Sequence, residues 1–508
     1  MIKKYILAHD LGTSGNKASI YDDTGNLVAN TFYGYNTMYP KIGWVEQKPN
    51  DWWEAVIYST KDLLVNSKVK KEEIACVVFS GQMMSALPVD KNCTPLSNSI
   101  IWADTRSVDQ ANQLKNIVEQ EEIYKITGHR CSPNYSATKI MWLRDNKRNI
   151  YDEAYKFLHV KDFIVSKLTS AFVTDFSDAS GMNLLNINDL SWSSVLIEAS
   201  KIDPNKLPDL HASTDIVGEV SLQASKEIDL LPGTPVVIGG GDGSCAAMGA
   251  GIINEGSAYN YIGSSSWIGI TSNKPIFDKD MSTFNWVHLD PKKYCPTGTM
   301  QAAGGSYSWL KENLCPLETK IANEISVSPY KLMDLEAELT KAGSDGLIYL
   351  PYILGERSPY WNPNARGVFV GLSQNHTRNH IIRSVLEGIT FNLKIILEVF
   401  ESQLNINSIK IIGGGAKGQL WRQIMADIYE KTILVPQFLE EATSLGAAVA
   451  GGIGIGFFKN FDVVNNFIKI VDKINPIPEN SKKYREIFPI FKECYSVMVP
   501  IFDKIACV

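Results

Sequence analysis

Short apolar runs that end in glycine-rich or hydroxyl-rich turns recur along this chain of 508 residues. Because turn residues bound these runs and they are too short for helices, they predict buried strands of a mixed or parallel sheet. In an open α/β sheet, ligands bind beyond the carboxyl ends of the strands. The predicted strands cover residues 4–8, 74–80, 236–238, 258–262 and 408–412.

Elsewhere apolar residues return every three or four positions, which is the period of an amphipathic helix. The clearest case is 381–396, with Thr377 as the expected start of the helix. A second helix is predicted at 420–428, and the small residues of 445–452 predict a closely packed one. Strands that alternate with helices predict an α/β protein.

The stretch 236–244, near the middle of the chain, reads Val-Val-Ile-Gly-Gly-Gly-Asp-Gly-Ser. Its three glycines free the backbone for an unusual turn or for close approach to a ligand. A single carboxylate, Asp242, then stands at the tip. We predict that Asp242 is a catalytic base at the floor of a cleft between two lobes. The alternative is that Asp242 only caps the helix that follows it.

Two strand–turn–strand units resemble each other half a chain apart. The first has the turn Gly-Thr-Ser-Gly at 12–15, and the second has Gly-Ser-Ser-Ser at 263–266, an offset of 251 residues. Backbone N–H groups and hydroxyls in such turns suit an anion. Asp10, at the end of the first strand, suits Mg²⁺ beside a phosphate. The repeat indicates two related lobes that offer phosphate turns to one cleft, although ordinary hairpin turns would read the same way.

Length and composition narrow the possible functions. A chain of 508 residues exceeds what one core supports, so two or three domains are expected. A net charge of −6 argues against a nucleic-acid or anionic-membrane partner. The apolar run at the N-terminus is too short for a signal peptide, and no run is long enough for a membrane span. The eight cysteines lack zinc or Cys-x-x-Cys spacing, which predicts reduced thiols in a cytoplasmic protein.

A glycine pattern leaves an alternative function open. Gly413-x-Gly415-x-x-Gly418 follows a predicted strand and fits the dinucleotide fingerprint of a nicotinamide dehydrogenase. It does not head a βαβ unit that ends in a clear acidic residue, as that fingerprint requires. No Gly-x-x-x-x-Gly-Lys-Ser/Thr pattern occurs, which disfavours a P-loop kinase.

Taken together, these features favour phosphoryl transfer. Two hydroxyl turns clamp phosphates, the glycine turn at 413–415 admits adenine, Asp10 supports Mg²⁺ and Asp242 takes a proton. Trp102 and Asp104 add an aromatic face and a carboxylate that suit a polyol. A two-lobed ATPase that binds a protein partner and no sugar is a further alternative.

The order of motifs resembles the FGGY carbohydrate kinases, and most closely their xylulokinase branch. The motifs are Asp-x-Gly-Thr-Ser-Gly, Gly-Trp-x-Glu-Gln-x-Pro-x-x-Trp-Trp, Ser-Gly-Gln-Met, Trp-x-Asp-x-Arg, Gly-Gly-Gly-Asp, Gly-Glu-Arg-Ser-Pro and Gly-Gly-Gly-Ala, between residues 4 and 455. The resemblance implies two ribonuclease-H-like lobes of the actin and hexokinase type, with the active site between them. We expect the lobes to cover residues 1–249 and 250–508.

The resemblance also implies roles for individual residues, with ATP and Mg²⁺ as cofactors and a sugar or polyol as substrate. Asp242 is the base and Asp10 the metal carboxylate. The residues expected at the nucleotide and its phosphates are Thr13, Ser14, Gly15, Asn16, Ser264, Ser265, Gly304, Gly414, Gly415 and Gln419. The residues expected at the sugar are Gln82, Met83, Met84, Asp104 and Asp242.

Two positions depart from the xylulokinase pattern. Met84 stands where these kinases carry histidine, and Gly243 where they carry asparagine. Since unpaired polar groups decide which hydroxyls a site accepts, both changes affect substrate choice. The leading substrate is D-xylulose, and the alternatives are D-ribulose, L-xylulose, erythritol and glycerol. The sequence leaves the phosphorylated carbon, regulation and oligomeric state open, with a homodimer as one candidate.

Overall fold

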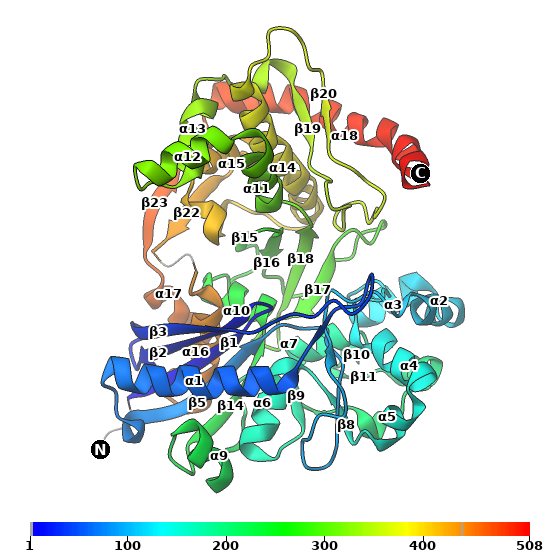
Figure 1. The fold of residues 1–508 in the computed structure, drawn as a ribbon, viewed down its shortest axis with the longest axis vertical. Coiled ribbons are helices and arrows are strands. Elements are labelled where there is room, and N and C mark those ends of the chain that lie inside the picture. The colour runs from blue at the N-terminus through cyan, green and yellow to red at the C-terminus, as the bar shows by residue number, and fades with distance from the viewer. Residues whose placement is uncertain (1–3, 438–439, 508) are drawn as a thin grey trace.

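The computed structural model describes residues 4–437 and 440–507. It contains two large mixed sheets, one in each half of the chain, and each is the centre of a lobe (Figure 1). In the view of Figure 1 the N-terminal half forms most of the lower lobe and the C-terminal half the upper lobe. No helix in the described ranges is long and apolar enough to cross a membrane.

The first sheet has six strands in the order β13-β14-β5-β1-β2-β3. Strand β1 runs antiparallel to β2 and parallel to β5, and β5 runs parallel to β14. Buried Val, Ile, Phe and Ala side chains fill β5, as expected for a central strand covered on both faces. The bounds are β1 Tyr5–Leu11, β2 Gly15–Asp22, β3 Leu27–Gly34, β5 Ile74–Gly81, β13 Ile216–Glu219 and β14 Pro235–Gly241.

The second sheet has seven strands in the order β17-β18-β16-β15-β21-β22-β23. Strand β15 runs antiparallel to β16 and parallel to β21, and β21 runs parallel to β22. The bounds are β15 Ala258–Ile262, β16 Ser266–Ile270, β17 Phe284–Val287, β18 Tyr294–Met300, β21 Ser408–Ile412, β22 Thr432–Pro436 and β23 Ile470–Ile474.

Both sheets therefore repeat one topology, a three-stranded antiparallel unit followed by two parallel strands, and the predicted relation between the halves is confirmed. The turns differ in length. Leu11 pairs with Asn16, which leaves four residues between them, whereas Ile262 pairs with Ser266, which leaves three. Asn16, and not Gly15, is thus the partner of Ser266 in the repeat.

Helices connect equivalent strands in the two lobes. Helix α1 (Pro49–Ser67) leads from β3 to β5, and α14 (Arg378–Glu401) leads from β18 to β21. Thr377 precedes α14 as its N-cap, as predicted. The other helices of eight or more residues are α2 Val108–Ile117, α3 Gln120–Thr127, α4 Ser136–Asn146, α6 Val160–Thr169, α10 Asp242–Gly249, α11 Gly304–Leu314, α12 Pro316–Glu324, α13 Pro329–Glu338, α15 Gln419–Tyr429, α16 Ala442–Gly454 and α18 Pro478–Ala506.

Short elements complete the chain and surround the two sheets. The two-residue and three-residue strands pair as β4 with β7, β6 with β8, β9 with β12, β10 with β11 and β19 with β20. Their bounds are β4 Glu46–Gln47, β6 Leu87–Val89, β7 Ser99–Ile100, β8 Lys156–Leu158, β9 Val173–Asp175, β10 Leu185–Asn186, β11 Ser191–Trp192, β12 Asp209–His211, β19 Ile348–Leu350 and β20 Val368–Val370. The short helices are α5 Arg148–Glu153, α7 Phe176–Ala179, α8 Ser194–Ser200, α9 Leu222–Ile228 and α17 Val464–Phe467.

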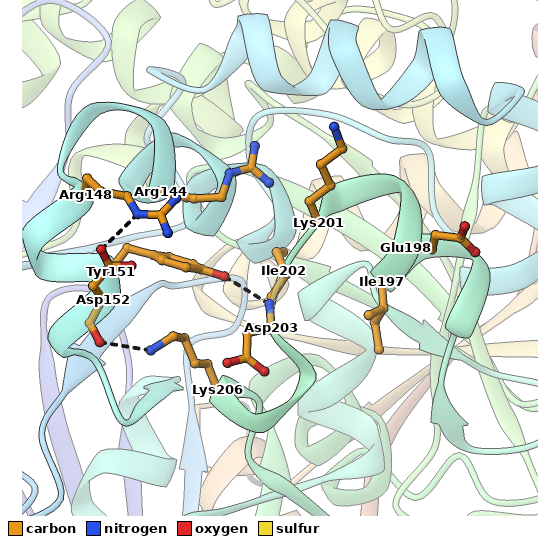
Figure 2. A pocket seen from close by; sticks show the side chains of 10 residues that line it. All are labelled: Arg144, Arg148, Tyr151, Asp152, Ile197, Glu198, Lys201, Ile202, Asp203 and Lys206. Atoms are coloured by element: carbon orange, nitrogen blue, oxygen red, sulfur yellow. Dashed lines mark hydrogen bonds and ion pairs between the residues drawn. The ribbon is translucent and has the colours of Figure 1, made fainter.

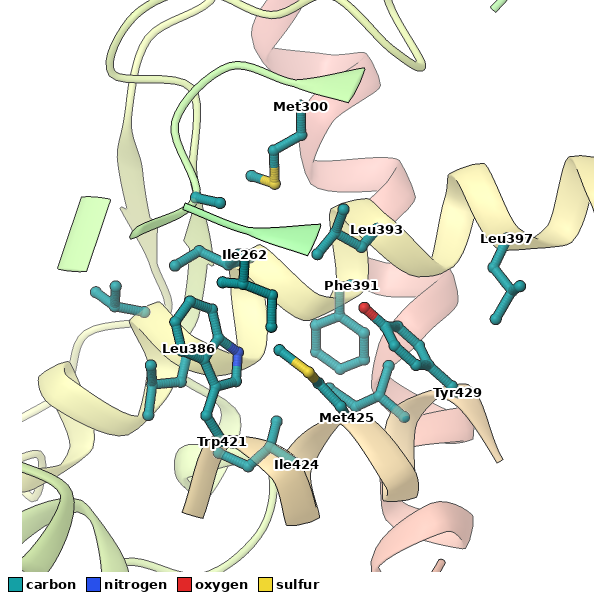
Figure 3. Packing of buried hydrophobic residues seen from close by; sticks show 14 of the residues in the cluster. Ile262, Met300, Leu386, Phe391, Leu393, Leu397, Trp421, Ile424, Met425 and Tyr429 are labelled. Carbon is teal, nitrogen blue, oxygen red and sulfur yellow. The ribbon is translucent and has the colours of Figure 1, made fainter. Parts of the chain in front are cut away.

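The core of the second lobe lies where α14 and α15 cover the sheet (Figure 3). The predicted apolar faces of both helices meet there and bury their side chains against Ile262 and Met300 of the strands. Figure 3 labels the helix residues Leu386, Phe391, Leu393, Leu397, Trp421, Ile424, Met425 and Tyr429.

Two helices rich in small residues join the lobes. A Cβ atom on Gly249 of α10 would lie 1.7 Å from the carbonyl oxygen of Ala442, and one on Gly446 of α16 would lie 2.0 Å from that of Cys245. The helices therefore touch backbone to backbone, which only glycine permits. Helix α16 also packs on the first sheet, where Gly451 lies against Val78. The close packing predicted for 445–452 is confirmed, and a segment of the second half belongs to the core of the first lobe.

Candidate active site

Three parallel strands of the first sheet end side by side. Asp10 of β1 pairs with Ser80 of β5, and Gly240 of β14 pairs with the same Ser80 from the other side. Asp242 follows two residues after Gly240, at the start of α10. The topology thus brings Asp10 and Asp242 to one edge of the sheet, and both are half-buried there.

The side chain of Asp242 makes little use of its hydrogen-bonding capacity. Helix α10 begins at Asp242 with Gly241 as its N-cap, and no side chain caps it. The carboxylate accepts one bond, from the N–H of the adjacent Gly243 at 2.7 Å. The helix-cap alternative is therefore not supported, and one carboxylate oxygen is left without a donor from the described chain.

Glycine is required before Asp242 because other backbone and side chains lie very close. Gly239 has φ +72°, and a Cβ atom there would lie 1.8 Å from the carbonyl oxygen of Phe79. A Cβ atom on Gly241 would lie 2.6 Å from the sulfur of Met83. The glycine run therefore lets β14 lie close to β5 and to Met83, one of the residues predicted to bind the sugar.

Burial shifts both carboxylates toward the protonated form, and the charge of Asp10 adds to the shift of Asp242. Burial raises the pKa of Asp242 to about 7, and the charges of Asp10 and Asp178 add to the rise. Burial raises the pKa of Asp10 to about 6, although Ser80 and the Lys17 ammonium oppose that shift. A group with a pKa near neutrality suits a general base.

The same pair fits a hard cation. Carboxylate oxygens are the ligands that Mg²⁺ prefers, and the ion usually keeps several waters. Asp10 and Asp242 repel each other at this edge, so a cation placed beside them would relieve the charge.

The first turn follows β1 and carries two hydroxyl side chains, Thr13 and Ser14. The Thr13 hydroxyl accepts a hydrogen bond from the Trp102 indole N–H at 2.9 Å. Ser14 is exposed. At Gly15 a Cβ atom would lie 2.5 Å from both the Tyr33 carbonyl oxygen and the ring of Phe32, so this glycine serves packing against β3.

Asn16 does not fit the predicted role of its side chain. It is fully buried, and its amide nitrogen lies 3.0 Å from His9 Nδ1 and donates to Ser59 Oγ at 2.7 Å. In the second lobe the equivalent Ser266 is buried in the same way and accepts from Asn260 at 2.9 Å. Both residues form hydrogen bonds within the lobe at the base of the turn, so contact of the Asn16 side chain with a ligand is not supported.

A pocket of about 760 Å³ lies in the second lobe beside the second turn. Residues from that turn, the start of α11, α13 and the glycine turn after β21 line it. The predicted nucleotide residues among them are Ser264, Gly304, Gly414, Gly415 and Gln419. Ser265 lies in the same turn but is not in its lining.

The glycines around this pocket are needed for different physical reasons. A Cβ atom on Gly304 would lie 2.4 Å from the carbonyl oxygen of Gly263, so α11 begins directly against the second turn. Gly413 has φ +89°, which favours glycine. A Cβ atom on Gly415 would strike Ile262 at 2.3 Å, whereas one on Gly414 would meet nothing within 4 Å. Gly414 alone therefore faces open space.

Sequence reasoning missed the polar and aromatic wall of this pocket. The rings of Tyr307 and Tyr330 stack with centroids 5.2 Å apart, and the Tyr307 hydroxyl donates to Asp334 at 2.7 Å. Burial raises the pKa of Asp334 to about 6. Tyr307 stands one helical turn after Gly304, and that spacing is the signal that could have found it.

The predicted sugar residues 82–84 come together beside Asp242. The Gln82 amide nitrogen donates to Gln47 Oε1 at 2.7 Å, while its own Oε1 is buried without a partner in the described chain. Met84 has φ +63°, and its carbonyl oxygen accepts from Lys139 Nζ at 2.7 Å. Met83 and Met84 are buried in a cluster that also contains Trp286.

Asp104 does not face open space. It is 0 % exposed and accepts from the Arg106 guanidinium at 2.7 Å and from the Val45 N–H at 2.5 Å. These bonds use its acceptor capacity, so direct sugar contact by this carboxylate is not supported. Trp102 is half-buried and packs against the cluster of Met83, and its contact with a polyol stays a prediction.

The second lobe contributes aromatic residues to the surroundings of Asp242. Tyr261 stacks on Trp267 with ring centroids 3.9 Å apart. Burial raises the pKa of Tyr261, and the charges of Asp10 and Asp242 add to the rise. The Trp286 indole nitrogen would lie 3.9 Å from a Cβ atom on Gly243. No sequence motif singled out Tyr261 or Trp286.

A buried charge cluster supports the backbone before Asp242. The N–H of Gly241 donates to the Ser177 hydroxyl, which donates to Asp175. The Lys161 ammonium lies 3.0 Å from Asp175 and 3.3 Å from Asp178. The group His159, Asp162 and Asp178 has metal-ligand spacing, but the ammonium already supplies the cation there.

A further pocket of about 490 Å³ lies away from these residues, between α5 and α8 of the first lobe (Figure 2). Two of its cationic side chains are engaged by Asp152. Arg148 Nε donates to Asp152 at 2.9 Å, and Lys206 Nζ donates to the Asp152 carbonyl oxygen at 3.3 Å. This pocket contains no predicted site residue.

Comparison with known proteins matches the whole arrangement. Residues 5–249 match the N-terminal domain of the FGGY family of carbohydrate kinases, and residues 258–455 match its C-terminal domain. A gluconokinase of Bacillus subtilis (strain 168) is 32% identical over 99% of this chain and 98% of its own. A xylulose kinase of Staphylococcus xylosus is 31% identical over 97% of this chain and 99% of its own.

Solved structures agree. The ligand-bound xylulose kinase from Lactobacillus acidophilus superposes with a TM-score of 0.92 at 28% identity, covering 99% of this chain and 100% of that one. Gluconate kinase from the same organism gives 0.92 at 28% identity, over 99% of both chains. These matches exclude a dinucleotide-binding dehydrogenase, and the antiparallel units in both sheets agree with that exclusion. Fold, site geometry and sequence similarity together identify the chain as a member of the FGGY family of carbohydrate kinases.

Proposed function

We propose that this ATP-dependent carbohydrate kinase phosphorylates a terminal hydroxyl of an open-chain sugar, with Asp242 as the general base. The observation that carries the proposal is the Asp242 carboxylate, which has one free oxygen and a pKa of about 7 at the edge shared by β1, β5 and β14. A general base must be unprotonated and free to accept a proton, and with a pKa of about 7 Asp242 becomes mostly unprotonated above neutral pH.

The reaction transfers one proton and one phosphoryl group. Asp242 accepts the proton of the substrate hydroxyl while that oxygen attacks the γ-phosphorus of ATP. The bond between the γ-phosphorus and its bridging oxygen breaks, and ADP leaves with the electron pair. Positioning and charge stabilisation supply most of the catalysis in such transfers.

The pocket of the second lobe is proposed to bind the nucleotide. Gly414 and Gly415 would let adenine lie against backbone, and Gln419 begins a helix at the same wall. The turn at 263–265 and the turn at 12–15 would hold the phosphates from opposite lobes. Thr13 and Ser14 contribute from the first turn, and Ser264 and Ser265 from the second, through hydroxyls and backbone N–H groups.

Asp10 is proposed to hold Mg²⁺, directly or through water. When bound, the ion neutralises charge on the transferred phosphate. The position of Asp10 on β1, beside Asp242, supports this role, because the Lys17 ammonium offsets its charge only in part and burial still raises its pKa to about 6.

Two substrates are proposed for the sugar site. D-xylulose is expected from the sequence, and relatives named xylulose kinase support it. D-gluconate is the second candidate, since relatives named gluconokinase are equally similar. Gln82 is proposed near either one, because it adjoins Met83, whose side chain packs against Gly241 beside Asp242.

A substrate panel tests the proposal. The protein is mixed with ATP and Mg²⁺, and ADP release is followed with ketopentoses, glycerol, erythritol and D-gluconate. We expect one of them to raise ADP release well above the sugar-free rate. No stimulation by any of them would overturn the proposal. ATP turnover that changes only with a protein partner would favour the ATPase alternative.

A further inference from the structure

Two arginines flank one tryptophan near the predicted sugar residues. The Arg130 guanidinium carbon lies 5.2 Å from the ring centroid of Trp361, and that of Arg357 lies 5.5 Å from it. Arg130 follows α3 in the first lobe, whereas Arg357 and Trp361 follow β19 in the second. Cation–π contact explains part of this arrangement but does not offset two neighbouring positive charges.

Neither guanidinium is paired with a carboxylate. In residues 4–437 and 440–507 no acidic oxygen lies within 4 Å of Arg130 or Arg357. Arg357 Nε is buried and has no hydrogen-bond partner there. Both side chains are half-buried, and Arg357 also interacts with the Tyr135 hydroxyl, which is neutral. Charges that are partly removed from water are stabilised by an opposite charge, so an anion would complete this pair.

The nearest acidic groups are used elsewhere. Asp278 offsets part of the effect of burial, which lowers the pKa of Arg130. Its two oxygens accept from the backbone N–H groups of Ser282 and Thr283. Glu356 precedes Arg357, but its carboxylate accepts from the N–H of Gln301 and from Asn392.

The arginine pair is continuous with the surroundings of Asp242. Trp361 packs on the buried cluster that contains Met83, Met84 and Trp286. Trp286 in turn lies against Gly243, next to the proposed base. A continuous set of packed side chains therefore runs from the neighbour of Asp242 to the ring that the two guanidinium groups flank.

We infer that Arg130 and Arg357 bind a carboxylate at the end of the substrate remote from the phosphorylated hydroxyl. The substrate class is then an aldonate, a sugar acid, and not a neutral ketose. The inference rests on the proposed function, since it assumes that Asp242 marks the reacting end. Guanidinium groups suit carboxylates because their planar fork matches two oxygens. One arginine comes from each lobe, so the bound anion would also connect the lobes.

Matched substrates and variants test the inference. D-gluconate is compared with D-glucitol, which has the same number of carbons and no carboxylate, and with D-xylulose. We expect wild type to prefer D-gluconate over D-glucitol by at least about tenfold in kcat/KM, the lower end of the contribution of a charged hydrogen bond. Arg130→Gln and Arg357→Gln should each raise the KM for D-gluconate by about 10- to 100-fold. The KM for D-glucitol should not change. Arg148→Gln, at the pocket of Figure 2, is the matched control.

A binding measurement separates this inference from the proposed base. Calorimetry of D-gluconate with Asp242→Asn needs no turnover, so it reports the carboxylate site even if Asp242 has another role. Binding that disappears when Arg357→Gln is added supports the inference. Equal binding of D-gluconate and D-glucitol overturns it, as does a substrate preference that ignores both arginine variants. A clear preference for a phosphorylated sugar would assign the site to phosphate and overturn the carboxylate.

Discussion

The two lobes share one sheet topology but carry different chemistry at equivalent strand ends. Leu11 and Ile262 are equivalent because each pairs across its turn, so Asp10 of the first lobe corresponds to Tyr261 of the second. One lobe therefore offers a carboxylate at the end of its first strand, and the other offers an aromatic ring.

The next strand shows the same contrast. Ser80 pairs with Asp10, and Ile412 pairs with Tyr261, so the residues after these two positions are equivalent. After β5 come Gln82 and Met83, whose buried side chains fill the space. After β21 the same positions are Gly414 and Gly415, beside a pocket of about 760 Å³. The comparison teaches that a few side chains at strand ends decide which lobe handles charge and which accommodates a large ligand.

The largest effect is expected from removing the Asp242 carboxylate of the first lobe. Asp242→Asn should lower kcat by about 10²- to 10⁴-fold, because the base is lost while the amide keeps the shape. The KM for ATP should change little, since the proposed nucleotide pocket lies in the other lobe. A coupled ADP assay measures both values, and exposed Asp152→Asn is the control. Near-normal turnover would contradict the assignment of proton transfer to the first lobe and nucleotide binding to the second.

The pH dependence sharpens the same point. The pKa of Asp242 is about 7, so at lower pH the base is protonated and kcat/KM should fall by about tenfold per pH unit. In the folded protein this pKa lies above the ordinary value of 3.8, so ionisation of Asp242 costs stability. That cost develops as the pH rises from about 4 and is complete above about 7.

The control for the pH profile is thermal unfolding. Asp242→Asn should gain Tm relative to wild type as the pH rises toward 7, and the gain should then stay constant. A pH–rate profile without a descending limb below pH 7 would contradict the assigned base.

The smallest expected effect comes from two neighbouring glycines of the second lobe. Gly415→Ala places a methyl group against Ile262 and should cost about 1–3 kcal/mol of stability, as overpacking does. Gly414→Ala meets nothing within 4 Å, so it should fold normally and raise the KM for ATP several-fold. Thermal unfolding and ATP kinetics distinguish the two variants. Equal behaviour would show that the glycine turn does not line the nucleotide site.

Much of the fold follows from sequence patterns. The strand predicted at 408–412 matches β21, and the apolar face at 381–396 lies within α14. Strand β1 extends to Leu11, beyond the predicted end at residue 8, because pairing with β2 and β5 continues through polar His9 and Asp10. Local hydrophobicity cannot report pairing that tertiary neighbours impose.

The site was predicted less evenly. Asn16 and Asp104 are residue types that often contact ligands. In this fold both are buried, and their side chains are hydrogen-bonded to other protein groups. Arg357 stood in a recognised motif without a role, and only the fold shows that its Nε has no hydrogen-bond partner in the described chain and that it faces Trp361. Whether a polar side chain is used or free depends on its neighbours in space.

By itself the sequence established an α/β protein of two related halves with glycine turns, because short-range patterns encode strands, turns and repeats. It also identified Asp10 and Asp242 as the candidate functional carboxylates. The tertiary structure decided which of those groups meet. Parallel strands that are distant along the chain end at one edge, and this brings Asp10 and Asp242 together. Burial there raises both pKa values, and the charge of Asp10 raises that of Asp242 further. Burial and charge interact through space, so no local pattern could have supplied that result.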